Sequence, residues 1–263
     1  MIAKSVFDAL GANVYIVNNE PNGLNVNLNA GSTHIDHFKE FCKENHLDVG
    51  FAFDGDADRC IAVDENGNEV DGDKIIYLLA KKLKAEEKLN GDTVVTTIMS
   101  NSGLTKALKA IGIKNVQTKV GDRFVYEEMM KSGYYLGGEQ SGHIIIRKYA
   151  TTGDGVLTAI NIVEAMLDSK QSLSKLVAPV KVLPQVLKNV RVTNKAAVVE
   201  DEEVKAAFEK VNKEIGDNGR AILRQSGTEP VVRIMLELDS LDECNRYIEQ
   251  IYNVIKKRGY VSE

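Results

Sequence analysis

The sequence predicts an α/β fold: two consecutive α/β domains with mixed sheets, followed by a small α+β domain at the C-terminal end. Short apolar runs typical of strands alternate with stretches of helical periodicity between residues 13 and 168, which is the pattern of α/β layers. After Pro184 the pattern changes to three strand-like runs interleaved with two amphipathic helices. Polar or proline-containing connections near residues 71 and 187 predict domains over residues 1–71, 72–186 and 187–263.

The helices are predicted from apolar residues three or four positions apart. In the stretch 73–89, Ile75, Ile76, Leu79 and Leu83 form one apolar face, and lysines occupy the far side. Asp154 is a suitable N-cap for the stretch that follows it. Helices are therefore expected over residues 1–10, 35–46, 73–89, 102–111, 122–130, 154–168, 201–215 and 241–257.

The strands are predicted from β-branched or alternating apolar residues between turn-forming residues. The run T-V-V-T-T-I-M, residues 93–99, is the most strongly β-branched of them. Strands are expected over residues 13–17, 49–54, 61–63, 93–99, 116–120, 134–137 and 143–147, and in the last domain over residues 190–192, 221–224 and 231–238.

The composition excludes several classes of protein. The chain has 263 residues, of which 43% are hydrophobic and 27% charged, close to the average for globular proteins and unlike a disordered chain or a coiled-coil rod. No apolar run reaches the roughly 18 residues of a membrane span, and the formal net charge of −5 argues against a surface for duplex nucleic acid. Three scattered cysteines make no disulfide framework or zinc ribbon, so a reducing, cytoplasmic location is expected.

One acidic segment is a candidate metal site. V-G-F-A-F-D-G-D-A-D-R-C-I-A-V, residues 49–63, places Asp54, Asp56 and Asp58 at alternate positions of a loop between two apolar strands. Three carboxylates in a confined loop repel one another strongly. A hard divalent cation removes this repulsion, and ligands that are all oxygen favour Mg²⁺ or Ca²⁺ over zinc. A solvated acidic turn is the alternative.

Two other motifs share part of this acidic pattern. A calcium-binding EF-hand loop that begins at Asp54 would end correctly at Glu65, but Arg59 occupies the position of its glycine and both flanks are strands. A phosphatase that forms an aspartyl phosphate would carry Asp54 and Asp56 at the end of an apolar strand, but Asp58 stands where threonine or valine is expected. The EF-hand is excluded, and the phosphatase stays an alternative.

A second segment has the residue types of a sugar-binding turn. Y-L-G-G-E-Q-S-G-H-I-I-I, residues 135–146, is a glycine-rich turn between two strands. Glu139 and Ser141 supply a carboxylate and a hydroxyl that accept and donate hydrogen bonds to neighbouring sugar hydroxyls. His143, at the end of the turn, is a candidate general acid or base, although a lone histidine is more often structural.

Two further segments suit an anion. L-R-Q-S-G-T-E-P-V-V-R-I-M-L-E, residues 223–237, combines arginines that bind phosphate in bidentate fashion with a Ser-Gly-Thr turn that presents hydroxyls and backbone N–H groups. The candidate phosphate-binding residues in it are Arg224, Ser226, Gly227, Thr228 and Arg233. T-K-V-G-D-R-F-V, residues 118–125, places Lys119 and Arg123 at the start of a predicted helix, where a solvated capping turn is the alternative.

Together these segments resemble the α-D-phosphohexomutase family, most of all its branch that acts on glucosamine phosphates. D-G-D-A-D-R is similar to the family's metal loop, G-E-Q-S-G-H to its sugar-binding loop and R-Q-S-G-T-E-P-x-x-R to its phosphate-binding loop, in the family's order. V-D-G-D-K, M-S-N-S-G-L, K-V-G-D-R-F-V and T-T-G-D-G are further similar stretches, so the likeness covers essentially the whole chain. E-Q-S-G-H and V-G-D-R favour glucosamine over mannose or glucose.

The resemblance implies a fold, a reaction and a set of roles. Four domains would surround a cleft, and this chain would hold most of the second domain, the third and the fourth. Glucosamine 6-phosphate and glucosamine 1-phosphate would be interconverted through a phosphoserine and a bisphosphorylated sugar. The three aspartates would hold Mg²⁺ against the phosphoserine, and Arg59 would help to neutralise the transferring group. Glu139 and Ser141 would bind the sugar hydroxyls, the phosphate-binding residues would hold the phosphate that does not react, and His143 would be a candidate acid or base.

One family motif is absent from the sequence. The family's nucleophilic serine lies in a T-A-S-H-N-P-like segment of the first domain, and neither Ser100 nor Ser141 is followed by His-Asn-Pro. The chain is therefore expected to be a fragment that is inactive alone, with the missing N-terminal domain and a hexosamine or hexose phosphate as partners and with neither nucleic acid nor membrane. A phosphomannomutase or phosphoglucomutase, and a catalytically silent phosphosugar-binding protein, stay alternatives.

Overall fold

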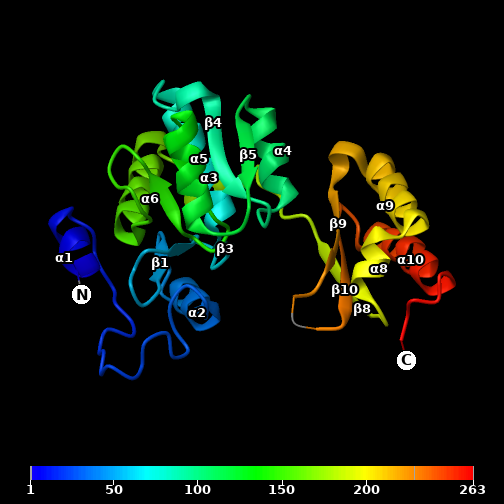
Figure 1. Ribbon diagram of the computed structural model, residues 1–263. Helices are drawn as coiled ribbons and strands as arrows, with labels where there is room; N and C mark the ends of the chain where they lie inside the picture. Colours follow the sequence, from blue (N-terminus) through cyan, green and yellow to red (C-terminus); the bar gives the residue numbers. More distant parts are fainter. Residues whose placement is uncertain (1, 228, 263) are drawn as a thin grey trace. The chain divides into compact units, whose positions relative to one another are not determined.

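The computed structural model describes residues 2–227 and 229–262. The chain divides into two compact units, whose helices and strands are labelled in Figure 1. The first unit comprises the chain up to Ser100 together with Leu104–Lys181, and the second comprises Asn101–Gly103 together with the chain from Val182 on. Among the described residues, no helix has the length and apolar character needed to cross a membrane.

The first unit begins with two helices and a small antiparallel sheet. The helices are α1 (Ile2–Ala9) and α2 (Asp36–Glu44), and the strands are β1 (Gly50–Phe53), β2 (Cys60–Val63) and β3 (Glu69–Val70), in the order β1-β2-β3. Helix α2 packs Cys42 against the sheet residues Ala52, Ile61 and Val63. Phe7 of α1 stacks on Phe51, with 5.7 Å between the ring centroids.

The predicted strand over residues 13–17 is wrong. These residues lie in an irregular segment between α1 and α2, and the apolar side chains of Tyr15, Ile16 and Val17 are exposed. A strand exists only where a neighbouring strand accepts its backbone hydrogen bonds. In the described part of the chain, β1 pairs with β2 alone and forms the edge of its sheet, so residues 13–17 have no strand to pair with.

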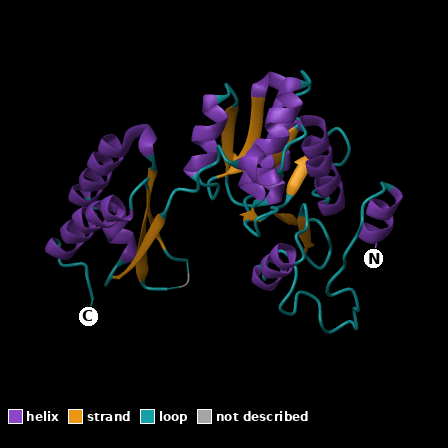
Figure 2. Cartoon of the chain, turned by 180° about the vertical axis from the view of Figure 1, so that it is seen from behind, coloured by secondary structure: helices purple, strands orange, loops and turns teal. Residues whose placement is uncertain are grey.

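The second sheet of this unit is mixed, and all its strands except β5 are buried. Its strands are β4 (Thr93–Thr97), β5 (Lys114–Thr118), β6 (Leu136–Gly138) and β7 (Ile144–Ile146), in the order β5-β4-β6-β7. The first three are parallel, and β7 runs antiparallel to β6. Val94 and Val95 belong to two different hydrophobic clusters, one on each face. Figure 2 shows helices on both sides of these strands.

The helices of this unit surround the mixed sheet. They are α3 (Gly72–Ala85), the short 3₁₀ turn η1 (Asn90–Asp92), α4 (Ser102–Ala110), α5 (Asp122–Ser132), α6 (Gly155–Ser169) and α7 (Leu173–Val177). The predicted cap is confirmed, since the Asp154 side chain accepts a hydrogen bond from Leu157 N at 2.9 Å. Asp71 caps α3 in the same way through Lys74 N.

The second unit is an antiparallel sheet with helices on one face. Its strands are β8 (Gln185–Arg191), β9 (Arg220–Gln225) and β10 (Val231–Glu237), in the order β8-β10-β9, and its helices are α8 (Lys195–Glu200), α9 (Glu202–Ile215), the 3₁₀ turn η2 (Gly216–Asn218) and α10 (Leu241–Lys257). Figures 1 and 2 both show the helices together on one side of the strands. Along β10 the buried residues Val232, Ile234 and Leu236 alternate with more exposed ones, as this arrangement requires.

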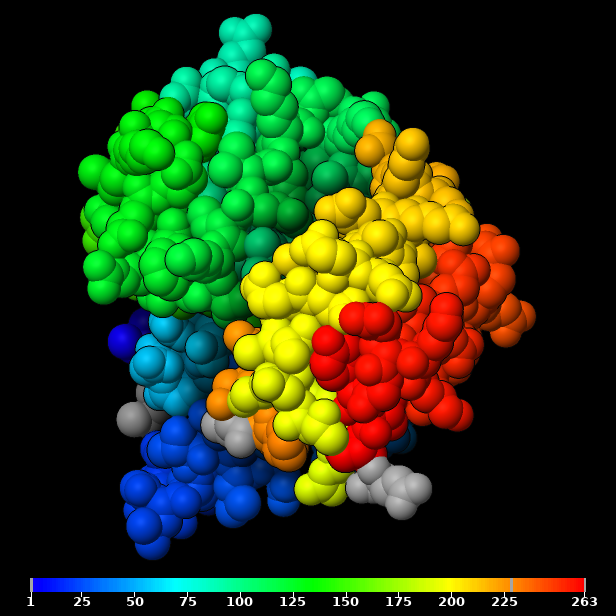
Figure 3. All heavy atoms as spheres, turned by 45° about the vertical axis from the view of Figure 1, so that its right-hand side comes forward, coloured from blue at the N-terminus to red at the C-terminus, as the bar shows by residue number. Residues whose placement is uncertain are grey.

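The end of the chain is fastened to the start of α9 in the second unit. The Asp201 carboxylate accepts hydrogen bonds from Arg258 Nε and from Tyr260 Oη, both at 2.9 Å. Figure 3 shows the corresponding red segment against the yellow one. Burial alone would raise the pKa of Asp201, but hydrogen bonds from Tyr260, the backbone of Val204 and Arg258 hold it below its usual value.

The predicted fold class is confirmed. α/β layers with a mixed sheet are followed by a small domain with an antiparallel sheet and helices, as the sequence indicates. The short elements β3, α7 and α8 were not predicted. They contain two to six residues, too few for a hydrophobic period to be visible.

Candidate functional site

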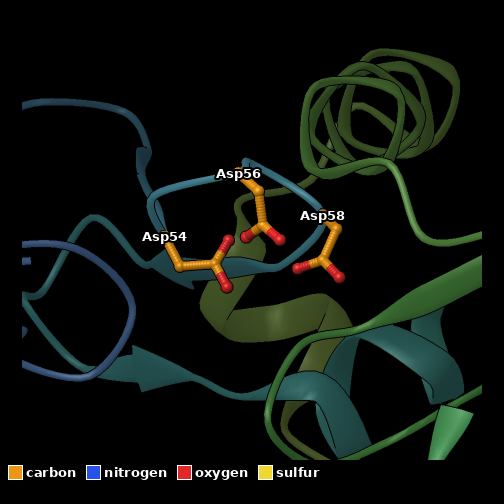
Figure 4. Close-up of side chains that lie close together, drawn as sticks. All are labelled: Asp54, Asp56 and Asp58. Carbon is orange, nitrogen blue, oxygen red and sulfur yellow. The ribbon is translucent and has the colours of Figure 1, made fainter. Parts of the chain in front are cut away.

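The turn between β1 and β2 brings three carboxylates together. Asp54, Asp56 and Asp58 each offer one oxygen, and these oxygens all lie within 4.8 Å of one another. Figure 4 shows the three side chains pointing toward a common space. The pairing of Phe53 with Cys60 closes the turn, so residues at alternate positions converge instead of pointing to opposite faces as they would in a strand.

The carboxylate cluster is electrostatically costly. The Asp54 side chain is only 6% exposed, and burial raises its pKa, with the charges of Asp58 and Asp56 acting in the same direction. Arg59 opposes this shift: its backbone N–H donates to Asp54 Oδ1 at 3.2 Å, and its guanidinium lies 3.5 Å from Oδ2. One arginine faces three carboxylates, so the turn retains excess negative charge.

One oxygen atom of the cluster indicates whether the three aspartates fit a metal ion. Asp58 Oδ2 is 3.0 Å from the His143 ring nitrogen Nδ1, whereas Asp58 Oδ1 is buried and has no hydrogen-bond partner in the described part of the chain. A buried carboxylate oxygen without a donor is unfavourable unless a cation occupies the space before it. The carboxylates of Asp54, Asp56 and Asp58 together give the all-oxygen donor set of a hard divalent cation. The three aspartates therefore fit a metal site.

Two other segments of the first unit hold the acidic turn in place. The backbone of Cys60 donates to Gly142 O at 3.0 Å, and Arg59 forms an isolated β-bridge with His143. From the T-T-G-D-G segment, Gly155 N donates to Ala57 O at 2.9 Å. The conformation of the turn thus depends on residues more than 80 positions further along the chain.

The G-E-Q-S-G-H turn is held against the start of α3. Gly72 N donates to Gln140 O at 2.9 Å, and Gln140 Nε2 donates to Asp71 Oδ2 at 3.2 Å. A Cβ atom on Gly72 would lie 2.0 Å from Glu139 O and 2.8 Å from Gly142 N. Only glycine allows this approach, which gives the V-D-G-D-K stretch a structural role that the sequence alone did not assign.

A cavity of about 440 Å³ opens beside the acidic turn. Its lining residues are Ser32, Thr33, Arg59, Ile61, Glu69, Asp71, Thr97, Met99, Val120, Glu139, Gln140 and Ser141. The volume lies in the range of small-molecule sites. Several of these residues follow the carboxyl ends of the parallel strands β4, β5 and β6, where ligands bind in open α/β sheets.

The structure brings three of the predicted site residues into this cavity. Arg59, Glu139 and Ser141 line it together, and Glu139 Oε1 accepts a hydrogen bond from Gly121 N at 3.0 Å. The other lining residues were missed. V-D-G-D-K, M-S-N-S-G-L and K-V-G-D-R-F-V, which contain or adjoin some of them, resemble the family in sequence, but only the fold shows which of their side chains reach a cavity.

The predicted residues Lys119 and Arg123 do not line the cavity. Both are exposed, and Arg123 Nε donates to Glu127 Oε1 at 2.7 Å within its own helix. The N–H group of Gly121, between them, is the one that bonds to Glu139. The backbone of this turn supports the cavity through Gly121, and the side chains of Lys119 and Arg123 are not part of its lining.

His143 is buried beneath the turn, with 3% of its side chain exposed. Its Nδ1 lies 3.0 Å from Asp58 Oδ2, and its Nε2 accepts a hydrogen bond from Gly153 N, also at 3.0 Å. Asp122 Oδ2 lies 4.0 Å from Nε2. His143 is not among the residues that line the cavity.

In the second unit, the predicted phosphate-binding residues lie at the β9–β10 hairpin. Arg224 and Arg233 are directly opposite each other in the antiparallel register, a placement that is unfavourable for like charges and that an anion relieves. Ser226 is buried, and its Oγ accepts a hydrogen bond from Glu229 N at 3.3 Å. Gly227 is exposed at the tip, and Thr228 lies outside the described residues.

The loop of this hairpin has a support that the sequence did not reveal. Lys195, at the start of α8, donates from Nζ to Ser226 O at 2.6 Å and to Gly227 O and Glu229 O at 3.4 Å. These bonds fix the loop and add a positive charge beside it. Arg233 is also paired with Glu229, at 2.7 Å, a carboxylate that a bound phosphate would have to displace or share.

Comparison with known families accounts for this set of segments. Three domain models of the phosphoglucomutase/phosphomannomutase family match the chain: alpha/beta/alpha domain II over residues 1–67, alpha/beta/alpha domain III over residues 71–183, and the C-terminal domain over residues 187–254. The chain belongs to the phosphoglucomutase/phosphomannomutase family.

Curated relatives show which members of this family the chain is similar to in sequence. The chain is 55% identical over 259 residues to the phosphoglucosamine mutase of Lachnospira eligens. The aligned residues make up 98% of this chain and 58% of that protein. It is 50% identical over 255 residues to the phosphoglucosamine mutase of Bacillus subtilis. Here the aligned residues make up 97% of this chain and 57% of that protein. The chain thus spans a little over half the length of these relatives.

Solved structures share the fold. A phosphoglucomutase/phosphomannomutase family protein from Burkholderia thailandensis superposes with a TM-score of 0.75 at 21% identity, over 97% of this chain and 57% of that one. The N-acetylphosphoglucosamine mutase of Aspergillus fumigatus, solved in complex with GlcNAc-6P and magnesium, gives a TM-score of 0.63 at 19% identity over 88% of this chain and 53% of that one.

The acidic turn predicts a stabilisation by Mg²⁺ that depends on Asp56. A ligand at 100 times its Kd stabilises the folded state by about 2.7 kcal/mol, or about 5–10 °C in Tm for a unit of this size. In Asp56→Asn the Mg²⁺-dependent rise should disappear, while the Tm without metal should stay equal or increase because one like charge is removed. Differential scanning calorimetry with and without Mg²⁺ measures both values.

Asp48→Asn is the matched control for this experiment. Asp48 is an exposed aspartate just before β1 and outside the turn, so this variant should keep the full response to Mg²⁺. An equal response in the wild type and Asp56→Asn would contradict the assignment of the metal site.

Proposed function

We propose that this chain carries the metal-binding, sugar-binding and phosphate-binding parts of a phosphoglucosamine mutase. The enzyme would interconvert glucosamine 6-phosphate and glucosamine 1-phosphate through a phosphoserine and a bisphosphorylated sugar. One observation carries the proposal: Arg59 belongs to the acidic turn and also lines the cavity with Glu139 and Ser141. A sugar bound in the cavity would therefore lie beside the metal ligands. The identity of 50–55% to phosphoglucosamine mutases supports the choice of sugar.

The acidic turn would bind Mg²⁺ next to the phosphoryl group. Asp54, Asp56 and Asp58 would be its ligands, and the ion would supply neutralisation of the negative charge between them and the phosphoryl oxygens. Arg59 would add a second positive charge to the same group. Transfer of a phosphoryl group requires mainly positioning and neutralisation, and the turn provides both without a nucleophile of its own.

The cavity would bind the sugar ring. Glu139 and Ser141 would exchange hydrogen bonds with its hydroxyls, and the other polar side chains of the lining, such as Gln140, would offer partners to the sugar in either orientation. The two orientations matter because each end of the bisphosphorylated intermediate has to reach the serine in turn. Arg224, Ser226, Gly227, Thr228 and Arg233 would hold the phosphate that is not being transferred.

The proposed partner is the part of the enzyme that carries the phosphoserine. The chain spans 58% of the relative from Lachnospira eligens, and its sequence contains no T-A-S-H-N-P-like segment. On this proposal residues 1–71, 72–186 and 187–263 correspond to the second, third and fourth domains. The chain alone would bind Mg²⁺ and phosphosugar without turning the sugar over.

The proposed location is the cytoplasm. Cys42, Cys60 and Cys244 are free and buried, and burial raises the pKa of all three thiols, that of Cys42 to about 11. Thiols that stay protonated and shielded are inert structural groups. Their unpaired state is the usual one in a reducing compartment.

Reconstitution tests the function directly. The chain would be mixed with the phosphorylated N-terminal portion of the Lachnospira eligens relative, and ³¹P NMR would follow glucosamine 6-phosphate in the presence of Mg²⁺. Glucosamine 1-phosphate should form only when both parts are present. Failure to interconvert any hexosamine or hexose phosphate would contradict the proposal. Release of inorganic phosphate by the chain alone, abolished in Asp54→Asn, would instead establish the phosphatase alternative.

The arginine pair predicts a loss of phosphosugar affinity without a loss of stability. Arg224→Ala should weaken binding of glucosamine 6-phosphate at least tenfold, because charge-assisted hydrogen bonds contribute about 1.5–3 kcal/mol each. Its free energy of unfolding should not fall, because the facing Arg233 loses a like-charged neighbour. Isothermal titration calorimetry and urea unfolding measure the two quantities.

Arg246→Ala serves as the control for the arginine variant. Arg246 is 57% exposed on α10 and pairs with Glu243 of the same helix, so its removal should leave the affinity for glucosamine 6-phosphate unchanged. The same affinity in Arg224→Ala and Arg246→Ala would remove the hairpin from the phosphate site.

A further inference from the structure

We propose that His143 is a positioning residue of the metal site: its ring orients Asp58 so that Oδ1 is presented to the cation. The inference rests on the proposed function, because it concerns the same acidic turn. It gives the histidine a different task from the general acid or base that its place in the sequence first suggested. The observations that carry it are the two hydrogen bonds of the ring, its burial and the lack of space around it.

The hydrogen bonds fix which ring nitrogen carries the proton. The backbone N–H of Gly153 donates to Nε2 at 3.0 Å, so Nε2 acts as an acceptor and holds no proton. In the neutral ring the proton is then on Nδ1, which donates to Asp58 Oδ2 at 3.0 Å. The backbone amide selects the tautomer, and the tautomer determines that Asp58 receives a hydrogen bond.

This hydrogen bond gives the two oxygens of Asp58 different roles. Oδ2 is occupied by the ring, and Oδ1 is buried without a partner among the described residues. A carboxylate fastened at one oxygen cannot rotate freely, so the hydrogen bond holds the Asp58 carboxylate in its orientation beside Asp54 and Asp56. Histidines or other groups that hold a ligand in this way commonly change metal affinity by 10–100-fold when removed.

Gly153 holds the ring in this orientation. A Cβ atom on Gly153 would lie 2.7 Å from Cε1 and Nε2 of His143 and 2.6 Å from Asp58 O. Such distances are too short for any side chain at residue 153. The glycine of T-T-G-D-G therefore allows its backbone to approach the ring closely enough for the N–H···Nε2 bond.

The same geometry disfavours direct proton transfer to a substrate. A general acid or base needs a nitrogen within about 2.6–3.2 Å of the reacting atom, or one water away. His143 has 3% of its side chain exposed, is absent from the cavity lining and has both nitrogens engaged. Asp122, 4.0 Å from Nε2, is too distant to replace the Gly153 bond.

Two isosteric substitutions separate positioning from a structural role. In His143→Asn the side-chain amide nitrogen can occupy the place of Nδ1 and donate to Asp58. In His143→Gln the amide can occupy the place of Nε2 and cannot reach Asp58 in the same way. Binding of Mn²⁺, an ion that suits the same oxygen ligands as Mg²⁺, is measured on the full chain from the electron paramagnetic resonance signal of the free ion.

The expected result is a clear difference between the two variants. His143→Asn should keep the Mn²⁺ Kd within about threefold of the wild type, and His143→Gln should raise it by about 10–100-fold. Both should retain the circular dichroism spectrum of the wild type. His37→Gln, at an exposed histidine of α2, is the control and should not change the Kd.

A spectroscopic measurement checks the same point without any substitution. In ¹⁵N NMR of the wild-type chain, the His143 ring should show the neutral form with the proton on Nδ1. The other neutral tautomer, with the proton on Nε2, would overturn the inference. Should either variant fail to fold, this measurement still tests the premise that Nδ1 donates to Asp58.

The outcomes distinguish this inference from the proposed function. If the wild type binds Mn²⁺ and both histidine variants bind it equally well, the positioning role is wrong while the metal site stands. If the wild type does not bind Mn²⁺ at millimolar concentrations, the metal site itself is wrong and the positioning role with it. A loss of affinity in His143→Gln that His143→Asn restores supports both.

Discussion

The mutual repulsion of three carboxylates in one short turn is the constraint on which the first unit depends. Asp54, Asp56 and Asp58 converge only because the β1–β2 pair closes the turn between them. A short hairpin does not keep such a group together unaided, since burial already raises the pKa of Asp54 and its neighbours add to that shift. The surrounding structure therefore has to supply the hydrogen bonds that hold the turn.

Those hydrogen bonds come from distant parts of the chain. The turn at residues 139–143 binds Cys60 and Asp58, the T-T-G-D-G segment binds Ala57 and His143, and Gly72 brings the start of α3 against the same turn. The turn at residues 139–143 and Asp71, just before α3, also border the cavity, which places the candidate sugar-binding residues next to the candidate metal ligands. The second unit repeats the principle with the opposite charge, since Arg224 faces Arg233 and an anion would relieve the repulsion.

The sequence was sufficient for the fold class and for the residues that define each loop. Periodicity identified the long helices and strands because their apolar faces are buried in the two cores. It failed at residues 13–17, where a β-branched run has no neighbouring strand among the residues that the structure describes, and at elements of two to six residues. A strand depends on the neighbouring strand as much as on its own residues, and the local sequence does not show which segment will be that neighbour.

The candidate site was predictable in part for the same reason. Motif spacing singled out the aspartates, Glu139, Ser141 and the arginines as candidates, because each group lies within one segment. Lys195, Gly72 and Gly153 act on segments from elsewhere in the chain, so only the fold reveals them. The role first assigned to His143 illustrates the limit, since its residue type suggested chemistry while its two hydrogen bonds favour support.

Anomalous X-ray scattering from crystals of the chain soaked in Mn²⁺ tests the central claim most directly. The account predicts a single strong peak about 2.0–2.3 Å from oxygens of Asp54, Asp56 and Asp58, with Asp58 Oδ1 among the ligands and Oδ2 still bonded to the His143 ring. A peak coordinated by other residues, or no peak at the acidic turn while Mn²⁺ binds elsewhere, would contradict it.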